Sequence, residues 1–534
     1  MPKMYSQAVH PDYASKPWDV IIIGSGLGGM TSGTLLARAG KRVLMLERHY
    51  MPGGFTHTFK RKGFEWDVGV HYVGQVAEKN SILRKIFDYV SEGQITWAEM
   101  GTVYDRAIIE GDIYDFVSGT ENQIQNLLTH FPLEEKSIRA YFSLVKSTAR
   151  SAAWFFGEKT MPKWMSRTIG RLLRWKFNSA SKKTTYDVLK SITSDEKLIS
   201  VLCAQCGDYG LEPKKSSFGI HAVVVDHYLS GGSYPVGGAK KIHEAIIASF
   251  EKSGGTLLLK AEVMSILVDQ GKAVGVEFTN GERVYSDIVI SNAGVMNTFK
   301  HLLGHTDVLS KQETEALSEV KSSTAHVCLY VGLEGSDTEL ALPKNNIWIY
   351  DDYDFNEVGA RSGGNPLAEK GLTYISFPSA KDPAWAASHP GKATVQVISA
   401  CAYDQVRTWE KESFGKRSDE YESFKRLVSE KLTRKLIEAV PQIEGRISFS
   451  ELSTPLSTKH FMGYKSGEIY GLEHSPKRFD LSLLRPQTKI PGLYLTGQDV
   501  VTVGVGGALY SGVLAATKVL NKSVMLRVLF NRPL

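Results

Sequence analysis

Residues 18–47, WDVIIIGSGLGGMTSGTLLARAGKRVLMLE, decide the fold. This stretch predicts a buried β-strand, a glycine turn, a helix and a second buried strand. Gly24, Gly26 and Gly29 follow the first strand directly and open the helix, which lets the pyrophosphate of a dinucleotide approach the backbone and the positive helix N-terminus. Glu47 ends the second strand, where its carboxylate can accept hydrogen bonds from ribose hydroxyls. The stretch therefore predicts a dinucleotide-binding βαβ unit.

The residues after Glu47 indicate which dinucleotide is bound. An acid at this position repels a 2′-phosphate, so the pocket suits FAD or NAD better than NADP. The pair Gly53 and Gly54 lies just beyond it, where backbone amides can approach a second phosphate. Arg48 either adds a positive charge there or is an ordinary surface arginine.

The C-terminal region supplies a second motif, YLTGQD (494–499), followed by VTVGVGGALYSG. A strand ending in TGxD resembles the segment in which flavoproteins place an acid against the ribityl chain and pyrophosphate. We therefore expect Asp499 in that position, with a plain helix cap as the alternative. A helix starting near Gly506 and Gly507 would point its positive end at the flavin N1/O2 edge, which becomes anionic on reduction. A backbone edge at Val263 is expected near the adenine. The predicted FAD-binding residues are Gly24, Ser25, Gly26, Gly28, Gly29, Glu47, Arg48, Gly53, Gly54, Val263, Gly497, Asp499, Gly506 and Gly507.

Composition narrows the class of protein. With 534 residues the chain has room for two or three domains, and a net charge of +6 does not indicate a nucleic-acid binder. The first eighteen residues contain no apolar run of signal-peptide length, so we expect no leader and a cytoplasmic location. The four cysteines, Cys203, Cys206, Cys328 and Cys401, fit a reducing compartment. The Cys203-x-x-Cys206 pair lacks partner ligands, so structural thiols are favoured over a redox or metal site, and no metal is expected.

Six segments in order along the chain carry a family resemblance: GSGLGG (24–29), GFEWDVGVHYVG (63–74), HYLSGGSYPVGGAKKI (227–242), FPSAKDPAW (377–385), GKRSDEYESFK (415–425) and YLTGQDVVTVGVGGAL (494–509). In these segments the chain resembles the phytoene desaturase/carotenoid isomerase family of FAD oxidoreductases, and within it the retinol saturase-like group. One departure is that the animal saturases enter the secretory pathway, whereas no signal segment is expected here.

The resemblance implies an α/β fold, with a Rossmann-like FAD-binding domain of the glutathione-reductase/amine-oxidase type, an inserted α+β substrate domain and a helical cap. The FAD-binding domain is expected at 17–75, 226–300 and 486–522, the substrate domain at 301–485 and the cap at 76–225. The resemblance also implies a lipophilic polyene substrate. FAD is expected to be non-covalent, since no cysteine lies in the C-terminal flavin segment. The lack of a second GxGxxG motif leaves NAD(P)H only as a transient electron donor.

Reduction of a polyene C=C bond needs a hydride from flavin N5 and a proton from another group. We expect the proton donor among His71, Tyr72, Tyr228 and Tyr234, each of which could instead have only a packing role; histidine has the best-matched pKa. The segment Tyr234–Gly238 is expected to bring backbone close to the isoalloxazine. Asp67 and Gly69 are expected on the same side as His71.

A basic, tryptophan-rich stretch covers about 159–183. Its cations are Lys159, Lys163, Arg167, Arg171, Arg174, Lys176, Lys182 and Lys183, and its apolar residues are Trp164, Met165, Ile169, Leu172, Leu173 and Trp175. The pattern predicts a helix lying in a bilayer interface, as a peripheral membrane contact. The alternative is a cap helix packed on the core with a solvated basic edge. Nucleic acid is not an expected partner.

Three functions remain open from the sequence. The first is a saturase-like reductase of a retinoid, carotenoid or related polyene, and the second is a desaturase or cis–trans isomerase on the same substrates. The third is a non-catalytic isoprenoid binder, as Rab escort and GDI proteins are, although such binders do not need an intact flavin pocket. An amine oxidase is less favoured, and the sequence does not indicate an oligomeric state.

Overall fold

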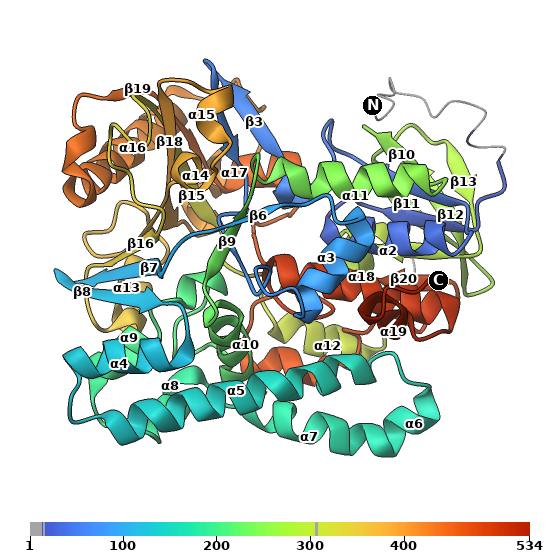
Figure 1. Ribbon diagram of the computed structural model, residues 1–534. Helices are drawn as coiled ribbons and strands as arrows, with labels where there is room; N and C mark the ends of the chain where they lie inside the picture. Colours follow the sequence, from blue (N-terminus) through green and yellow to red (C-terminus); the bar gives the residue numbers. More distant parts are fainter. Residues whose placement is uncertain (1–12, 14–15, 305–307) are drawn as a thin grey trace.

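The computed structural model describes residue 13, residues 16–304 and residues 308–534 (Figure 1). The expectation that the N-terminus lacks a leader falls largely on residues 1–12 and 14–15, outside the described residues. Within the described part of the chain, no helix combines the length and apolar character needed to cross a bilayer.

The predicted βαβ unit lies at the centre of a parallel five-stranded sheet. The sheet order is β10 (Thr256–Leu259), β2 (Val43–Glu47), β1 (Val20–Ile23), β14 (Val289–Ser291) and β20 (Leu493–Leu495). Every residue of β1 and β2 is buried, as expected for a sheet covered on both faces. Helices α2 (Leu27–Arg38), α11 (Lys240–Lys252) and α18 (Gly504–Leu520) pack together beside it. The sheet therefore joins segments from both ends of the chain.

Residues 263–285 form the predicted meander. Strands β11 (Val263–Asp269), β12 (Lys272–Phe278) and β13 (Arg283–Tyr285) pair antiparallel and lead back into β14. The turn residues between them, such as the Asn-Gly of TNGE, explain the tight connections.

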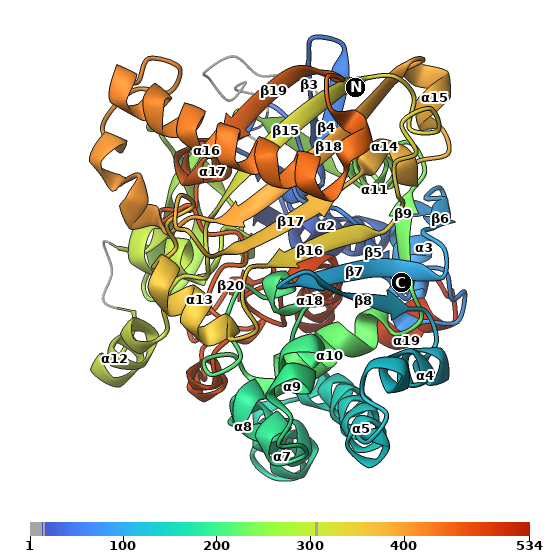
Figure 2. The same cartoon turned by 90° about the vertical axis from the view of Figure 1, so that its left-hand side faces the viewer.

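A second, seven-stranded sheet carries the other half of the molecule. Its order is β19 (Ile447–Ser453), β15 (His326–Glu334), β18 (Lys392–Ala400), β17 (Leu372–Ser376), β16 (Asn346–Tyr350), β7 (Val103–Ile109) and β8 (Asp112–Val117). Figure 2 shows α16 (Asp419–Ala439) lying across one face of this sheet.

The prediction of 76–225 as a helical cap is wrong at its start. Residues 103–117 form the β7–β8 hairpin, and β7 pairs in parallel with β16, so this segment belongs to the seven-stranded sheet. A hairpin of this kind needs a long-range partner to be stable, and that partner lies about 240 residues further along the chain.

The remainder of that region is helical and forms a layer along the lower edge of Figure 1. It contains α4 (Thr120–His130), α5 (Glu135–Glu158), α6 (Lys163–Arg167), α7 (Ile169–Ser181), α8 (Thr185–Lys190), α9 (Glu196–Leu202) and α10 (Phe218–Tyr228). Two small sheets complete the fold. The hairpin of β3 (Thr58–Arg61) and β4 (Phe64–Asp67) packs against β18 of the seven-stranded sheet, and β5 (Val73–Gly74), β9 (Gly232–Pro235) and β6 (Trp97–Glu99) form a three-stranded sheet whose β5 contacts α10. The other helices are α3 (Ile82–Ser91), α12 (Lys311–Glu319), α13 (Phe355–Ser362), α14 (Pro378–Lys381), α15 (Trp385–Ser388), α17 (Pro455–Met462) and α19 (Val524–Leu529).

Candidate functional site

One cavity of about 1320 Å³ is lined by both large sheets, the C-terminal segments and the loop between α9 and α10. Pockets for a single drug-sized ligand are about 300–1,000 Å³, so this cavity has room for more than one such molecule. Its walls differ in chemistry from one end to the other, and we describe the two ends in turn.

At the glycine end, the N-terminal and C-terminal turns touch. A methyl group added to Gly28 would lie 2.6 Å from the backbone nitrogen of Gly497. A methyl group on Gly512, in α18, would lie 2.7 Å from the carbonyl oxygen of Gly28. Both Gly28 and Gly497 line the cavity. The two predicted motifs therefore form one wall, and glycine is required where they meet.

The second glycine pair stacks on the first turn. Gly53 and Gly54 adopt left-handed backbone angles (φ +102° and +56°) that favour glycine. Gly53 N donates to Ser25 Oγ (3.1 Å), and a methyl group on Gly54 would lie 3.1 Å from Gly26 Cα. Gly24, Gly26, Gly53 and Gly54 line the cavity, whereas Ser25 and Gly29 lie behind it. The close stacking leaves backbone exposed to a ligand at this end.

Glu47 is buried and held in a fixed orientation at the same end. Its carboxylate accepts from Ser25 N (2.9 Å), Ser25 Oγ (2.7 Å) and His49 N (2.8 Å). An ionised carboxylate has about four lone-pair sites, so capacity remains for a ligand hydroxyl. Arg48 and Val263 also line the cavity, and Arg48 Nη2 lies 3.4 Å from Glu262 Oε1. This donor and acceptor set fits the adenosine part of FAD.

Asp499 is buried and ties three segments of the wall together. Its Oδ1 accepts from Leu472 N and its Oδ2 from Val295 N, both at 2.8 Å, and Arg478 Nη1 lies 3.9 Å from Oδ1. Asp499 does not cap α18, which has Val503 at its N-cap position and no side-chain cap. Its bond to Val295 N does satisfy the first N–H of the helical segment that begins at residue 295. Asp499 lines the cavity, so it can also face a ligand.

The prediction for Gly506 and Gly507 needs correction. Helix α18 begins at Gly504, and the cavity wall there is Gly504, Val505 and Ala508. Gly506 faces Leu83, and a methyl group on Gly507 would lie 1.9 Å from the carbonyl oxygen of Thr502. These two glycines therefore serve packing, and the positive helix end is two residues earlier than expected.

The opposite end of the cavity is aromatic and apolar. Strands β16, β17 and β18 and helix α13 contribute Trp348, Tyr350, Phe355, Leu372, Tyr374 and Ile398. A wall of this composition suits a long apolar ligand. The cavity thus joins a polar, glycine-lined end to an aromatic end.

Of the four predicted proton donors, His71 lines the cavity. Its ring lies edge-on to Tyr374 (5.3 Å between centroids), and its Nδ1 has no hydrogen-bond partner among the described residues. Burial, with repulsion from Lys381, lowers the pKa of His71 to about 3, so the imidazole is neutral at neutral pH.

The three tyrosines lie behind the described cavity wall, so we do not retain them as proton donors. Tyr72 stacks on Tyr228 (4.2 Å between centroids). Tyr234 donates to Asp67.

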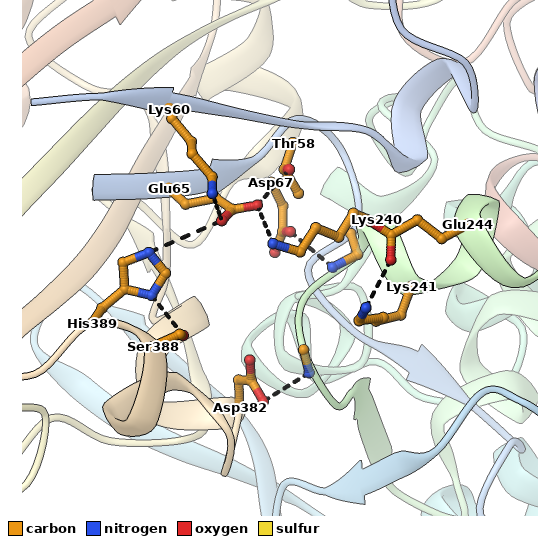
Figure 3. A network of polar contacts seen from close by, with 12 residues as sticks. Thr58, Lys60, Glu65, Asp67, Lys240, Lys241, Glu244, Asp382, Ser388 and His389 are labelled. Carbon is orange, nitrogen blue, oxygen red and sulfur yellow. Dashed lines mark hydrogen bonds and ion pairs between the residues drawn. The ribbon is translucent and has the colours of Figure 1, made fainter. Parts of the chain in front are cut away.

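The Tyr234–Gly238 segment is fixed away from the cavity by a polar network. Figure 3 shows Asp67 and Asp382 on either side of this segment, with Glu65, Lys60 and Lys240 nearby. Asp67 Oδ1 accepts from Ala239 N and Asp382 Oδ1 from Gly237 N, both at 2.9 Å. The expectation that this segment brings backbone close to the isoalloxazine is therefore wrong: its hydrogen bonds join β4, α11 and the turn after α14. Gly69 does line the cavity.

Sequence analysis missed Asn292 as part of the glycine end. A methyl group on Gly26 would lie 2.8 Å from Asn292 Nδ2, and one on Gly497 would lie 2.9 Å from Asn292 Oδ1. Asn292 follows β14 directly, and polar residues at the carboxyl end of a parallel strand are the signal that could have identified it.

The Cys203-x-x-Cys206 pair is structural, as favoured. Both thiols are free and buried, and burial raises the pKa of Cys206 to about 12. A protonated thiol of this kind is unreactive.

The basic stretch forms α6 and α7, but two of its cations turn inward. Lys159 Nζ donates to the carbonyls of Leu484 (2.7 Å) and Val500 (2.5 Å), and Arg174 pairs with the buried Glu158 (2.6 Å). The side chain of Lys163 lies outside the described set.

Arg167, Arg171, Lys176 and Lys183 are exposed and form no ion pair with the described residues, whereas Lys182 pairs with Asp480 (2.6 Å). Beside them are Trp154, Trp164, Leu172 and Trp175, which are 64%, 68%, 74% and 69% exposed, and the exposed Ile169. Met165 and Leu173 are half-buried. These exposed residues are called the basic tryptophan patch below.

Comparisons with known proteins agree with this geometry. Residues 27–520 match the family model of flavin containing amine oxidoreductases. The human all-trans-retinol 13,14-reductase is 35% identical over 98% of this chain and 88% of its own. A chloroplastic prolycopene isomerase from an Oncidium hybrid is 26% identical over 95% of this chain and 84% of its own. The structure of a Methanosarcina mazei oxidoreductase superposes with a TM-score of 0.61 at 18% identity, over 94% of this chain and all of that one, and so shares the fold. The chain belongs to the flavin-containing amine oxidoreductase family and, within it, to the family of the all-trans-retinol 13,14-reductases.

Proposed function

We propose that this chain is an FAD-dependent oxidoreductase that adds two hydrogens across one C=C bond of a polyene lipid such as a retinoid or carotenoid. The single observation that carries the proposal is the continuous cavity, with its glycine-lined end at Gly28 and Gly497 and its aromatic end at Trp348 and Tyr374. The name of the human relative, a reductase of all-trans-retinol, supports the same reaction.

The residues at the glycine end would hold the FAD. Backbone at Gly24, Gly26 and Gly54 would receive the phosphates, Glu47 the ribose hydroxyls, and Gly504 at the start of α18 the flavin edge. When bound, a reduced flavin supplies a hydride. The protein's part is to hold the target bond at reacting distance, about 3–3.5 Å, and to exclude water around it.

We propose that the FAD is non-covalent and that NAD(P)H reduces it transiently. Cys206 is the cysteine on the described cavity wall, and it lies at the aromatic end with its Sγ 3.5 Å from Tyr350 Oη. Acid precipitation of the purified protein should release all the flavin into the supernatant. Yellow colour that stays with the pellet would contradict non-covalent binding. Anaerobic bleaching by NADH or NADPH would identify the donor.

The reaction itself is tested with the reduced holoenzyme. A visible spectrum first establishes the flavin, and the photoreduced protein is then mixed anaerobically with all-trans-retinol and with carotenoids. A product heavier by two hydrogens, together with reoxidised flavin, is the expected result. Unchanged mass with a new isomer would replace the proposal by a cis–trans isomerase. In a parallel mixture with the oxidised holoenzyme, loss of two hydrogens together with reduced flavin would replace it by a desaturase. A colourless protein that binds the polyene would indicate a non-catalytic binder.

We also propose that the basic tryptophan patch docks on an anionic membrane surface facing the cytoplasm. Trp164, Leu172 and Trp175 offer apolar area, and Arg167 and Arg171 offer charge that forms no ion pair with any described residue. An anionic bilayer interface binds this combination. The free, buried thiols fit a reducing compartment. A substrate dissolved in lipid would then be close to the enzyme.

The docking is measured with vesicles of phosphatidylcholine, with and without phosphatidylserine. Each arginine near such a surface contributes about 1 kcal/mol, so Arg167→Gln with Arg171→Gln should weaken binding about 30-fold. Leu526→Glu, at an exposed apolar position in α19, is the matched control for Leu172→Glu. Equal losses for the two leucine variants, or binding that ignores phosphatidylserine, would refute the docking.

A further inference from the structure

A buried chain of polar groups ends at the aromatic part of the cavity wall. Tyr72 Oη lies 2.8 Å from Asp105 Oδ2 and 3.0 Å from Asp208 Oδ2. Asp105 is fully buried behind the wall, whereas Asp208 lines the cavity with Trp348 and Tyr374. One tyrosine hydroxyl therefore stands between an inner and an outer carboxyl group.

Counting hydrogens assigns a proton to the outer carboxyl. A tyrosine hydroxyl has one hydrogen to donate. Asp105 is the closer acceptor, and it also accepts from Gln205 Nε2 (2.9 Å) and Asn346 Nδ2 (2.8 Å), so three donors surround its ionised form. The 3.0 Å contact of Asp208 with the Tyr72 oxygen is then a hydrogen bond only if Asp208 itself carries the hydrogen. The chain runs from the Asp208 hydroxyl to Tyr72 and on to Asp105.

Charge reinforces this assignment. Lys381 lies on the inner side, where its Nζ donates to Asn346 Oδ1, Ser376 Oγ (2.7 Å) and the carbonyl of His71 (3.0 Å). Burial lowers the pKa of Lys381 to about 7, against the attraction of Asp105 and Asp67. The protonated form of Lys381 favours an ionised Asp105, although burial raises the pKa of Asp105 to about 6. Burial, followed by repulsion from Asp105, raises the pKa of Asp208 well above its usual value.

We infer that Asp208 is the acid that protonates the substrate double bond, with Tyr72 and Asp105 as positioning residues that hold its proton at the cavity wall. This inference rests on the proposed function. One carbon of the double bond accepts the hydride supplied by reduced flavin. The other forms a C–H bond with the Asp208 proton as the O–H bond breaks. The products are the saturated bond, oxidised flavin and the Asp208 carboxylate, which water reprotonates, while a reduced nicotinamide returns the two electrons.

Asp208 suits this role better than His71, which lines the same cavity. His71 has no imidazolium proton to give at neutral pH. The titratable groups electrostatically coupled to Asp208 are Asp105, Tyr72, Tyr104, Cys206, Tyr228, Tyr350, Tyr374 and Tyr470. Asp105 is the carboxyl group among them. Asp105 and Asp208 therefore hold one carboxyl proton between them, and Tyr72 bridges the two side chains.

The test compares Asp208→Asn and Tyr72→Phe with a control, Glu196→Gln, in α9. Glu196 is exposed and pairs with Lys190 away from the cavity. A general acid contributes about 10²–10⁴-fold, so Asp208→Asn should lower kcat by that factor. Flavin spectrum and polyene affinity, measured with oxidised protein, should stay as in the wild type. Glu196→Gln should match the wild type throughout.

Infrared spectroscopy gives a readout that does not need turnover. The oxidised holoenzyme should show the C=O band of a protonated carboxyl at neutral pH, and Asp208→Asn should lose it. In Tyr72→Phe the pH at which this band titrates and the pH at which kcat changes should move together.

Two outcomes would overturn the inference while leaving the proposed function intact: a reducing wild type with no such band, or an Asp208→Asn variant with wild-type kcat. A wild type that never changes the mass of any polyene would overturn the proposed function, and the donor role with it, even if the band confirms a protonated Asp208.

Discussion

The contact between the two glycine turns gives the sharpest test of the site. In Gly28→Ala the added methyl group would lie 2.6 Å from Gly497 N and 2.8 Å from both Asn292 Oδ1 and Thr496 Oγ1. Ordinary contacts begin at 3.4 Å, so the C-terminal turn must retreat. Gly497 N also donates to Ser511 Oγ (2.7 Å), which ties that turn to α18 and resists the movement.

The size of the effect follows from overpacking. Forcing a methyl group into a packed contact costs about 1–3 kcal/mol. The protein relieves this strain by separating the two turns, and closing them on the flavin restores the clash. The strain therefore lowers flavin affinity, and we expect a dissociation constant about 5- to 150-fold weaker than that of the wild type.

The affinity is measured by titrating FAD into the apoprotein and following quenching of flavin fluorescence. Gly157→Ala is the matched control, because a methyl group at that helical glycine meets no described atom within 4 Å beyond its chain neighbours and the backbone of its own helix. The control should keep wild-type affinity and gain about 0.5–1 kcal/mol of stability. A Gly28→Ala apoprotein that binds FAD as tightly as the wild type would refute the view that these turns grip the nucleotide together.

Three further predictions follow from single contacts. Glu47→Gln leaves one of the donors at Ser25 N and His49 N without an acceptor. FAD binding should therefore weaken by about 1–3 kcal/mol in the same titration. An unchanged affinity would contradict the role of Glu47. Burial lowers the pKa of His221 from 6.5 to about 3, so the unfolded state binds more protons than the folded state between these pH values. The free energy of unfolding should therefore fall as the pH drops through this range. In urea titrations, His221→Gln should make this fall less steep between neutral pH and about pH 5. Lys159→Met should lower stability by about 1–3 kcal/mol without changing vesicle binding, because its amino group is bonded inside the protein; weaker vesicle binding would contradict this.

The sequence predicted the nucleotide-binding half of the fold because its signals are local. Residues 18–47 contain strand, turn and helix patterns that need no distant partner to be recognised, and β1, α2 and β2 follow them closely. The C-terminal motif was found for the same reason. The meeting of Gly28 with Gly497 confirms that the two belong to one wall.

The errors share a different cause, which is that the deciding partners lie far away in the sequence. The β7–β8 hairpin depends on β16, and Tyr234 turns away from the cavity because Asp67 accepts its hydrogen bond. Arg174 turns inward because it pairs with Glu158, which is buried beside the distant Arg485. No periodicity within a segment reports such pairings. The pairing of Asp105 with Asp208 through Tyr72 was invisible for the same reason.

The parallel pairing of β14 with β20 has a consequence for biosynthesis. Strand β1 starts at Val20 and β20 ends at Leu495, so the ribosome must deliver everything from 20 to 495 before the last strand can close the sheet. Coenzyme loading is therefore a late event that follows translation, and a nascent chain stalled before β20 would expose an unpaired sheet edge to chaperones instead of retaining a yellow chromophore.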